Sequence, residues 1–157
     1  MVTLRRWMWI QAMSLHQGGF VFYAAVVVPI GTEQLGSALL QGLITQRVTW
    51  WLNLFGLVWL PIAAWDIAAE SARRRRRWIV WSLRAVLTLA LIALHHEMAA
   101  GIDLERERIV DRSAFRLRHV AYLWLTTLDW TLGLLAVLQA IRVWSRPAVI
   151  APQSHSE

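Results

Sequence analysis

The chain has 157 residues, 57% of them hydrophobic, and its 16 basic and 10 acidic residues give a formal net charge of +6. In an ordinary soluble domain about 45–50% of the residues are hydrophobic, so the higher share here argues against a soluble globular protein. Cysteine is absent, so disulfides, thiolate metal sites and cysteine nucleophiles are excluded. Arginines that flank long hydrophobic segments indicate the charge bias of a membrane protein, and we therefore expect no nucleic-acid binding.

Four apolar runs are each long enough to cross a bilayer as a helix, which takes about 20 residues. They cover residues 7–30, 48–69, 78–98 and 119–143. Because the connecting segments are short, residues 1–157 are predicted to form one membrane domain, an all-α four-helix bundle. The segment 145–157 contains prolines and no apolar periodicity, so we expect a mobile tail.

The first run follows Arg5 and Arg6, as the core of a secretory signal peptide would. It is longer than the roughly 7–15 residues of such a core and has polar residues in its middle, so we interpret it as a retained helix. Pro29 and Gly31 are expected to end this helix.

Apolar residues recur at helical spacing between the first and second runs, with polar residues between them. They are Leu35, Leu39, Leu40, Leu43 and Ile44. This pattern predicts a short amphipathic helix that lies on the outer membrane interface.

Arginine is unevenly distributed between the two sides of the predicted bundle. The side with nine arginines holds Arg5, Arg6, Arg73, Arg74, Arg75, Arg76, Arg77, Arg142 and Arg146, and the side with six holds Arg47, Arg106, Arg108, Arg112, Arg116 and Arg118. The positive-inside rule therefore places both termini in the cytoplasm of an inner (plasma) membrane protein. The run Arg73 to Arg77, in the turn between the second and third runs, is predicted to be a topology anchor that touches lipid headgroups.

Each apolar run has one stripe of polar or small residues at steps of three and four. The stripe of the last run is His119, Tyr122, Thr126, Asp129 and Gly133; the others are Trp81, Arg84, Thr88 and His95, then Thr49, Asn53 and Gly56, then Met13, His16, Phe20 and Tyr23. Polar groups cost several kcal/mol when unpaired in hydrocarbon, so the stripes are predicted to face the bundle interior. Gly56 and Gly133 are expected to let the helices approach closely.

Antiparallel helices place residues that are equidistant from their connecting turn at similar depths. About a turn centred near Arg74, Asn53 pairs with His95, and about a loop centred near Glu107, His95 pairs with His119. Two polar layers are therefore predicted, about 14 Å apart if nine residues separate them. The outer layer is Tyr23, Asn53, His95 and His119, and the middle layer is His16, Thr88 and Asp129.

Ionisable residues at bilayer depth indicate a functional site, and several interpretations are open. His95 and His119, with Met98, His96 or Tyr23 as a further donor, could bind copper or clasp haem b. The same residues could instead form interhelical hydrogen bonds that hold the bundle together.

Two further polar pairs are predicted deeper in the bundle. His16 and Asp129 form either a proton relay or a hydrogen-bonded structural pair. Asp66 and Arg84, near the inner ends of adjacent helices, are expected to form a structural ion pair.

Three stretches of the chain resemble known membrane proteins. They are Gly19-Phe-Val-Phe-Tyr23 to Val28-Pro29, Ile44-Thr-Gln-Arg-Val-Thr49 to Leu52-Asn-Leu54, and Phe115-Arg-Leu-Arg-His119-Val-Ala-Tyr122 to Asp129-Trp130. The chain is similar to small four-helix membrane proteins of unknown function, of the transmembrane-protein-205 type, and more loosely to the copper-resistance D membrane domain. The first resemblance implies the four-helix fold, and the second implies a copper role for His95 and His119.

These observations favour an accessory or scaffolding subunit of a larger membrane complex. The alternatives are a copper- or haem-linked membrane protein and a small protein that handles protons or solutes. We expect no enzymatic activity, because the sequence shows no recognisable acid/base pair, activated nucleophile or phosphate loop. The expected partners are the lipid bilayer and either other membrane subunits or further copies of the chain.

Overall fold

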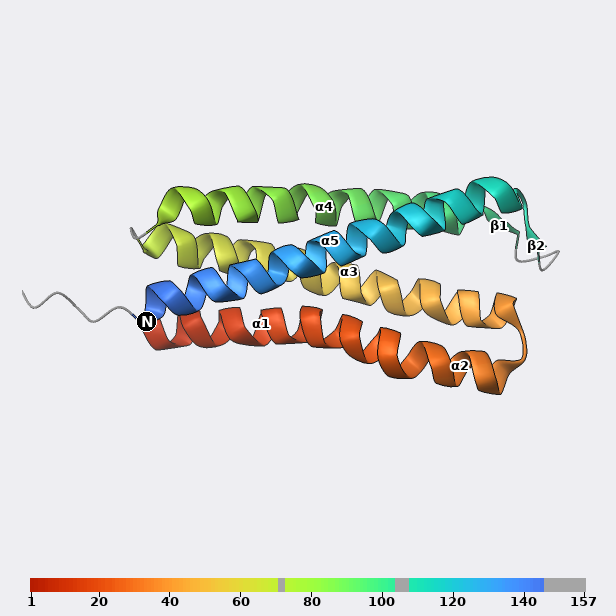
Figure 1. Ribbon diagram of the computed structural model, residues 1–157, viewed down its shortest axis with the longest axis horizontal. Helices are drawn as coiled ribbons and strands as arrows, with labels where there is room; N and C mark the ends of the chain where they lie inside the picture. The colour runs from red at the N-terminus through yellow and green to blue at the C-terminus, as the bar shows by residue number, and fades with distance from the viewer. Residues whose placement is uncertain (71–72, 104–107, 146–157) are drawn as a thin grey trace, which may run out of the picture.

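The computed structural model describes residues 1–70, 73–103 and 108–145, and the predicted tail after residue 145 lies outside them. Helix α1 (Val2–Phe22) continues through a π-helical turn, η1 (Tyr23–Val27), into α2 (Val28–Leu35). Helices α3 (Ala38–Ala69), α4 (Arg74–Ala100) and α5 (Arg112–Trp144) complete an antiparallel bundle (Figure 1). The short strands β1 (Ile102–Asp103) and β2 (Arg108–Ile109) pair in the α4–α5 connection.

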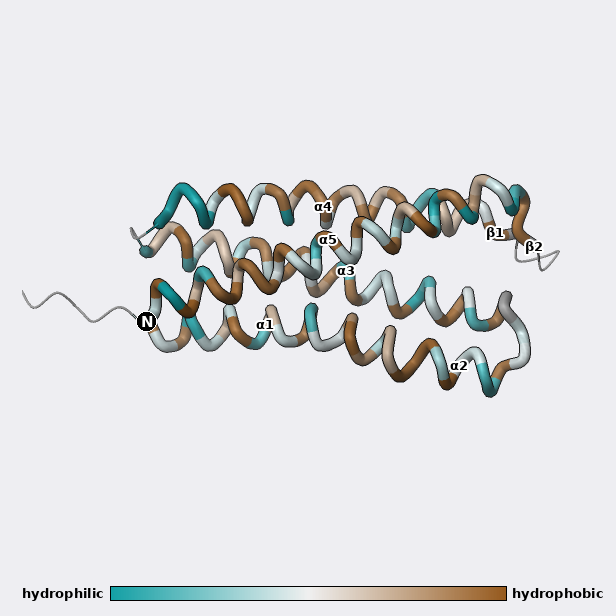
Figure 2. Tube along the Cα trace, viewed as in Figure 1, coloured by the Kyte–Doolittle hydropathy of each residue, from teal (hydrophilic) through white to brown (hydrophobic). Residues whose placement is uncertain are grey.

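Four helical segments are long and apolar enough to cross a membrane: Val2–Leu35, Leu40–Ala69, Arg74–Ala100 and Arg112–Trp144. Apolar residues extend over most of their length, and the hydrophilic residues gather towards the ends of the bundle (Figure 2). Large apolar side chains such as Leu89 and Trp124 are exposed, as expected for residues that face lipid. The prediction of an all-α, multi-pass membrane bundle is confirmed.

The first connection differs from the prediction. The first helix does not end at Pro29, because η1 widens the backbone just before it, and the Val28 N–H donates to the carbonyl of Tyr23 five residues earlier. A wider turn gives the proline ring room that an α-helical turn does not offer. The first span therefore reaches Leu35.

The predicted interfacial helix is wrong, because its residues belong to the two spans that flank it. Gly36 adopts a left-handed conformation (φ 59°) and Ser37 caps α3 by accepting a hydrogen bond from the Leu40 N–H (3.4 Å). A glycine that turns the chain and a serine N-cap reverse its direction within two residues. Residues 38–46 are consequently the first turns of α3, not a separate element.

The end of the bundle that contains the N-terminus and the α3–α4 turn is held by a charged network, and we call it the arginine end. Asp66, fully buried, accepts hydrogen bonds from Arg5 Nε (2.8 Å), from Arg77 Nη2 and from Trp144 Nε1 (3.3 Å). Glu70 accepts a further bond from Arg5 Nη2 (2.7 Å). All four spans are tied together here.

Helix α3 ends at Ala69 and α4 begins at Arg74, so the centre of the α3–α4 turn comes two to three residues before its predicted position near Arg74. This shift corrects two predictions. Asp66 lies level with Arg77 and not with Arg84, which is seven residues, or about 10 Å, farther along α4, so the predicted Asp66–Arg84 pair is wrong. His95 contacts Thr49 rather than Asn53. Within the predicted anchor, Arg77 is buried in the network, whereas Arg73, Arg74, Arg75 and Arg76 are exposed.

A hydrophobic layer follows the charged network towards the middle of the bundle. It consists of Trp9, Ala12, Met13, Trp59, Leu60, Ala63, Val80, Ala136 and Ala140. The Trp9 ring meets the Trp59 and Trp144 rings edge-on, at centroid distances of 5.8 and 5.3 Å. Small residues on α5 and large rings on α1 and α3 thus close this part of the bundle.

Helix α5 crosses the bundle obliquely: it starts beside the end of α4 and reaches the start of α1 at the arginine end (Figure 1). Its first turn is capped by Asp111, whose Oδ1 accepts from the Ala114 N–H (3.0 Å) and the Ser113 N–H (2.9 Å). These hydrogen bonds, that of Ala114 first, lower the pKa of the Asp111 carboxyl. Because α5 diverges from η1 and α2 towards its capped end, the opposite end of the bundle is open.

Candidate functional site

Arg84 of α4 occupies the middle of the bundle and contacts the three other spans. Its Nε and Nη2 each donate to one carboxylate oxygen of Asp129 at 3.0 Å, and Nη2 also approaches His16 Nδ1 at 3.0 Å. The guanidinium lies over the Trp59 ring, 4.1 Å from its centroid. The pair with Asp129 is bidentate, which is the strongest geometry available to an arginine and a carboxylate.

The predicted middle layer therefore forms in the structure, but the prediction did not include Arg84, the residue at its centre. His16 and Asp129 come together (Nε2–Oδ2 3.8 Å), and Thr88 is buried one turn from Arg84. Sequence reasoning assigned Arg84 to Asp66 and so missed its role. The spacing held the correct signal, because Arg84 and Asp129 lie 23 and 22 residues from the predicted loop centre.

The tautomer of His16 follows from its partner. A guanidinium can only donate hydrogen bonds, so His16 Nδ1 accepts from Arg84, and the neutral imidazole has its proton on Nε2. The lone pair that would take up a further proton is thereby occupied. This geometry favours the structural interpretation of the His16–Asp129 pair over a proton relay.

Glycines let the spans approach at this depth, as predicted. A Cβ atom at Gly56 would lie 2.9 Å from His16 Nε2, too close for an undisturbed contact. A Cβ at Gly133 would overlap the amide of Gln17, which donates to the Trp130 carbonyl (3.3 Å).

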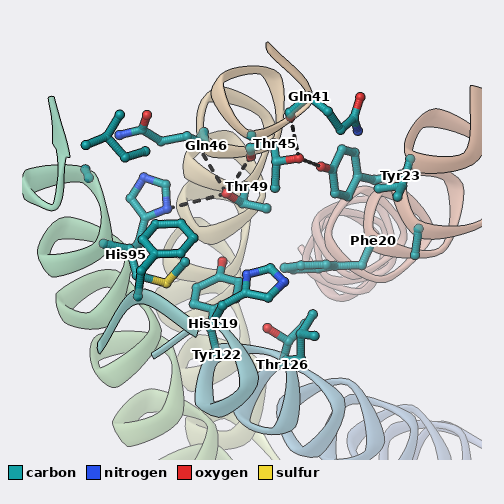
Figure 3. A pocket seen from close by; sticks show the side chains of 18 of the residues that line it. Phe20, Tyr23, Gln41, Thr45, Gln46, Thr49, His95, His119, Tyr122 and Thr126 are labelled. Atoms are coloured by element: carbon teal, nitrogen blue, oxygen red, sulfur yellow. Dashed lines mark hydrogen bonds between the residues drawn. The ribbon is translucent and has the colours of Figure 1, made fainter. Parts of the chain in front are cut away.

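A cavity of about 620 Å³ lies at the open end of the bundle. Helices α1, α3, α4 and α5, the turn η1 and strand β1 all contribute to its wall, which is mostly apolar. Figure 3 shows the polar side chains that reach it, with His95 and Tyr23 on opposite sides and His119 between them.

Three of the four residues predicted for the outer layer line this cavity. Tyr23, His95 and His119 are part of the wall, whereas Asn53 lies behind it and accepts a hydrogen bond from the Tyr122 hydroxyl (3.2 Å). His95 is buried against Trp50 and Tyr122, and His119 stacks on Phe115 at a centroid distance of 6.3 Å.

The hydrogen bond between His95 and Thr49 determines which imidazole nitrogen is free. The Thr49 hydroxyl donates its hydrogen to the Thr45 carbonyl (2.7 Å), so its oxygen accepts from His95 Nδ1 (3.4 Å). His95 Nε2 is left with a lone pair. A histidine whose other ring nitrogen donates in this way is oriented as metal-binding histidines usually are.

The donors available to a metal are few in this cavity. Met98 lies one turn from His95 and lines the cavity with it, whereas His96 is exposed on another face of α4. Among the described residues, no group of three or more histidine, cysteine, aspartate or glutamate residues is arranged to hold a metal ion. Any metal here would therefore depend on His95, His119 and the Met98 thioether.

Comparison of the chain with protein-family models, curated proteins and solved structures finds no match. The resemblance to the transmembrane-protein-205 type and to the copper-resistance D domain thus stays a prediction.

The Arg84 cluster generates a stability prediction. Substituting Asp129→Leu leaves the guanidinium without a counter-charge inside the bundle, and we expect a loss of about 3 kcal/mol of unfolding free energy, the lower end of the range for breaking a buried pair. Replacing both partners by apolar residues, Arg84→Met with Asp129→Leu, should recover most of that loss. Equilibrium unfolding by added sodium dodecyl sulfate in a mild detergent measures both variants.

Leu135→Ala, at an exposed position on the same helix, is the matched control and should cost under about 1 kcal/mol. If Asp129→Leu is no less stable than this control, Arg84 does not organise the bundle.

Proposed function

We propose that this membrane protein binds a small, mainly apolar molecule in the cavity at the open end of its bundle. The supporting observation is the cavity itself, since about 620 Å³ lies within the range of roughly 300–1,000 Å³ of small-molecule sites. Apolar walls with a few convergent polar groups, here Tyr23, His95, His119 and Tyr122, are typical of such sites.

The rest of the bundle supports a preformed site. The Arg84 cluster and the Asp66 network tie all four spans together between the middle and the arginine end. The far end, where α5 diverges, is open enough for a ligand. A ligand that enters there does not have to separate these buried contacts, which lowers the cost of binding.

We further propose that the protein acts as an accessory subunit of a larger membrane assembly. Gln11, Ser14 and Gly18 lie on one exposed face of α1, and an added Cβ at Gly18 would meet nothing within 4 Å. Small and polar residues on one helix face favour close helix–helix association in membranes. This face is available to a helix of another subunit or of a second copy.

The second candidate function is binding of copper or haem b. It is supported by the lone pair on His95 Nε2, which the Thr49 hydroxyl orients, and by His119 and Met98 in the same cavity wall. Two imidazoles and a thioether suit copper(I), and two imidazoles suit haem iron. The resemblance to the copper-resistance D domain gives the same expectation.

For the orientation, we propose that the arginine end faces the cytoplasm of an inner membrane. Arg73, Arg74, Arg75 and Arg76 are exposed there, next to the start of α4. Short basic connections of this kind are retained on the cytoplasmic side. The cavity would then open towards the outer side.

The cavity function is tested by filling the cavity. Ala99 lines it, whereas Ala100 is exposed, so we expect Ala99→Phe to abolish retention of the co-purifying ligand and Ala100→Phe to leave it unchanged. Mass spectrometry of extracts from protein purified in mild detergent measures the ligand. Equal ligand content in the two variants contradicts the proposal.

The same preparations decide the metal candidate. Copper by elemental analysis, or a haem absorption band, should be present in wild type and lost in His95→Ala if it is correct. Wild-type protein that lacks both signals after growth with copper and a haem precursor excludes it.

The accessory role is tested on the exposed face of α1. We expect Gly18→Ile to release a membrane subunit that wild-type protein retains in stoichiometric amounts, because the new side chain separates the two helices. Val86→Ile, at an exposed site on α4, should not release it. Quantitative mass spectrometry of the purified assemblies distinguishes another subunit from a second copy, and retention by Gly18→Ile would argue against this interface.

The orientation is tested with fused reporters. A reporter after Ser145 should be cytoplasmic, and one inserted between Val110 and Asp111 should be external. Neutral replacement of Arg73, Arg74, Arg75 and Arg76 should yield mixed orientations. The reverse reporter pattern in the wild type would disprove the assignment without affecting the fold.

A further inference from the structure

Five of the six hydroxyl groups on the described wall of the cavity give their hydrogens to the protein and not to the cavity. The five hydrogen bonds are Tyr23 to Thr45 Oγ1 (2.6 Å), Thr45 to the Gln41 carbonyl (2.8 Å), Thr49 to the Thr45 carbonyl (2.7 Å), Tyr122 to Asn53 Oδ1 (3.2 Å) and Thr127 to the Leu123 carbonyl (2.9 Å). A hydroxyl has one hydrogen and two lone pairs. With the hydrogen committed, each can only accept a bond from a ligand.

His95 belongs to the same pattern. Its Nδ1–H donates to Thr49, so Nε2 also offers a lone pair. Figure 3 shows the bonds that Tyr23, Thr45, Thr49 and His95 make along α3, with His95 at one side of the cavity and Tyr23 at the other. The two sides therefore present fixed acceptors to whatever lies between them.

The other polar groups of the wall do not discriminate between donors and acceptors. The Gln41 side chain has both an N–H and a C=O that no described residue satisfies, and the Thr126 hydroxyl is likewise without a partner among the described residues. The neutral imidazole of His119 can adopt either tautomer and so offer a donor or an acceptor. The selectivity of the cavity therefore depends on the fixed acceptors.

The wall also limits the charge and shape of a ligand. No aspartate or glutamate is among the described residues that line the cavity, so a cationic donor would be buried without a counter-charge, which is costly. Phe20, Tyr23, Phe115 and Tyr122 give it aromatic surfaces, which pack favourably on a planar ring. These features favour an uncharged aromatic donor.

We propose that the cavity selects a neutral aromatic alcohol with an apolar tail, such as a quinol headgroup, over the same molecule without its hydroxyl hydrogens. The two hydroxyls of a hydroquinone lie across the ring from each other, as His95 and Tyr23 lie across the cavity (Figure 3). The inference rests on the proposed small-molecule function of this cavity and names the ligand class. It involves binding alone, with no electron transfer.

The experiment compares two probes that differ only in their donors: a decyl-substituted hydroquinone, kept reduced under anaerobic conditions, and its bis(methyl ether). Binding to the full-length protein in detergent is measured by equilibrium dialysis. We expect the hydroquinone to bind about tenfold or more tightly, because the ether leaves the buried acceptors unpaired.

Substituted proteins locate the selectivity. His95→Phe should reduce the preference for the hydroquinone several-fold, whereas His96→Phe, at the exposed neighbouring position, should preserve it. Thr49→Val is the second variant: it removes the acceptor of the Nδ1 hydrogen, frees the imidazole to change tautomer and should also lower the preference. Circular dichroism shows whether each variant is folded.

The outcomes separate this inference from the proposed function. Equal binding of the two probes, or an undiminished preference in folded His95→Phe and Thr49→Val, overturns the ligand class. If Ala99→Phe still expels a different natural ligand in that case, the small-molecule function stands. If Ala99→Phe affects neither the probes nor a natural ligand, the cavity function itself is wrong.

Discussion

The bundle depends on one buried cation. Arg84 lies in the middle of a membrane-spanning helix, where an unpaired charge is expensive, and its guanidinium is satisfied by Asp129, His16 and Trp59 from the other three spans. Since a guanidinium has a rigid planar geometry, these contacts determine the depth and rotation of each helix relative to its neighbours. The neutral His16 adds no further charge, so the cluster is balanced by Asp129 alone.

The two ends of the bundle differ because of this central constraint. From Arg84 towards the N-terminus, the tryptophan and alanine layer and the Asp66 network fill the interior of the bundle. In the other direction α5 follows α4 and diverges from η1, so the same four spans enclose a cavity beside a smaller core of Phe20, Tyr23 and Leu52. A bundle that is rigid at one end and hollow at the other is suited to holding a ligand without rearranging.

The chemistry of the cavity arises from ordinary helix geometry. Threonine side chains at Thr45 and Thr49 return their hydrogens to backbone carbonyls one turn earlier, which is the usual behaviour of threonine in membrane helices. Because the threonine hydrogens are already used, Tyr23 and His95 must donate their own hydrogens to the threonine oxygens. The mostly apolar wall therefore has acceptors at fixed positions, and the ligand class we propose follows from the direction of these hydrogens.

The sequence by itself determined the membrane class, the four spans and the inward polar stripes, because length, hydropathy and helical periodicity are local properties. It also predicted that His16 lies near Asp129, which the structure confirms, and that His95 and His119 lie at one depth, where both line the cavity, since depth follows from counting residues from a turn. Only the tertiary structure decided the exact turns. The chain reverses at Gly36 and Ser37, so the residues expected to form an interfacial helix belong to α2 and α3, and α4 begins at Arg74. When the centre of a turn moves by two or three residues, the partner at a given depth changes by about five residues, or about 7 Å, so Asp66 meets Arg77, and Arg84 is free to pair with Asp129. The cavity could not be predicted either, because it depends on how α5 crosses the other spans, and no local pattern encodes that angle.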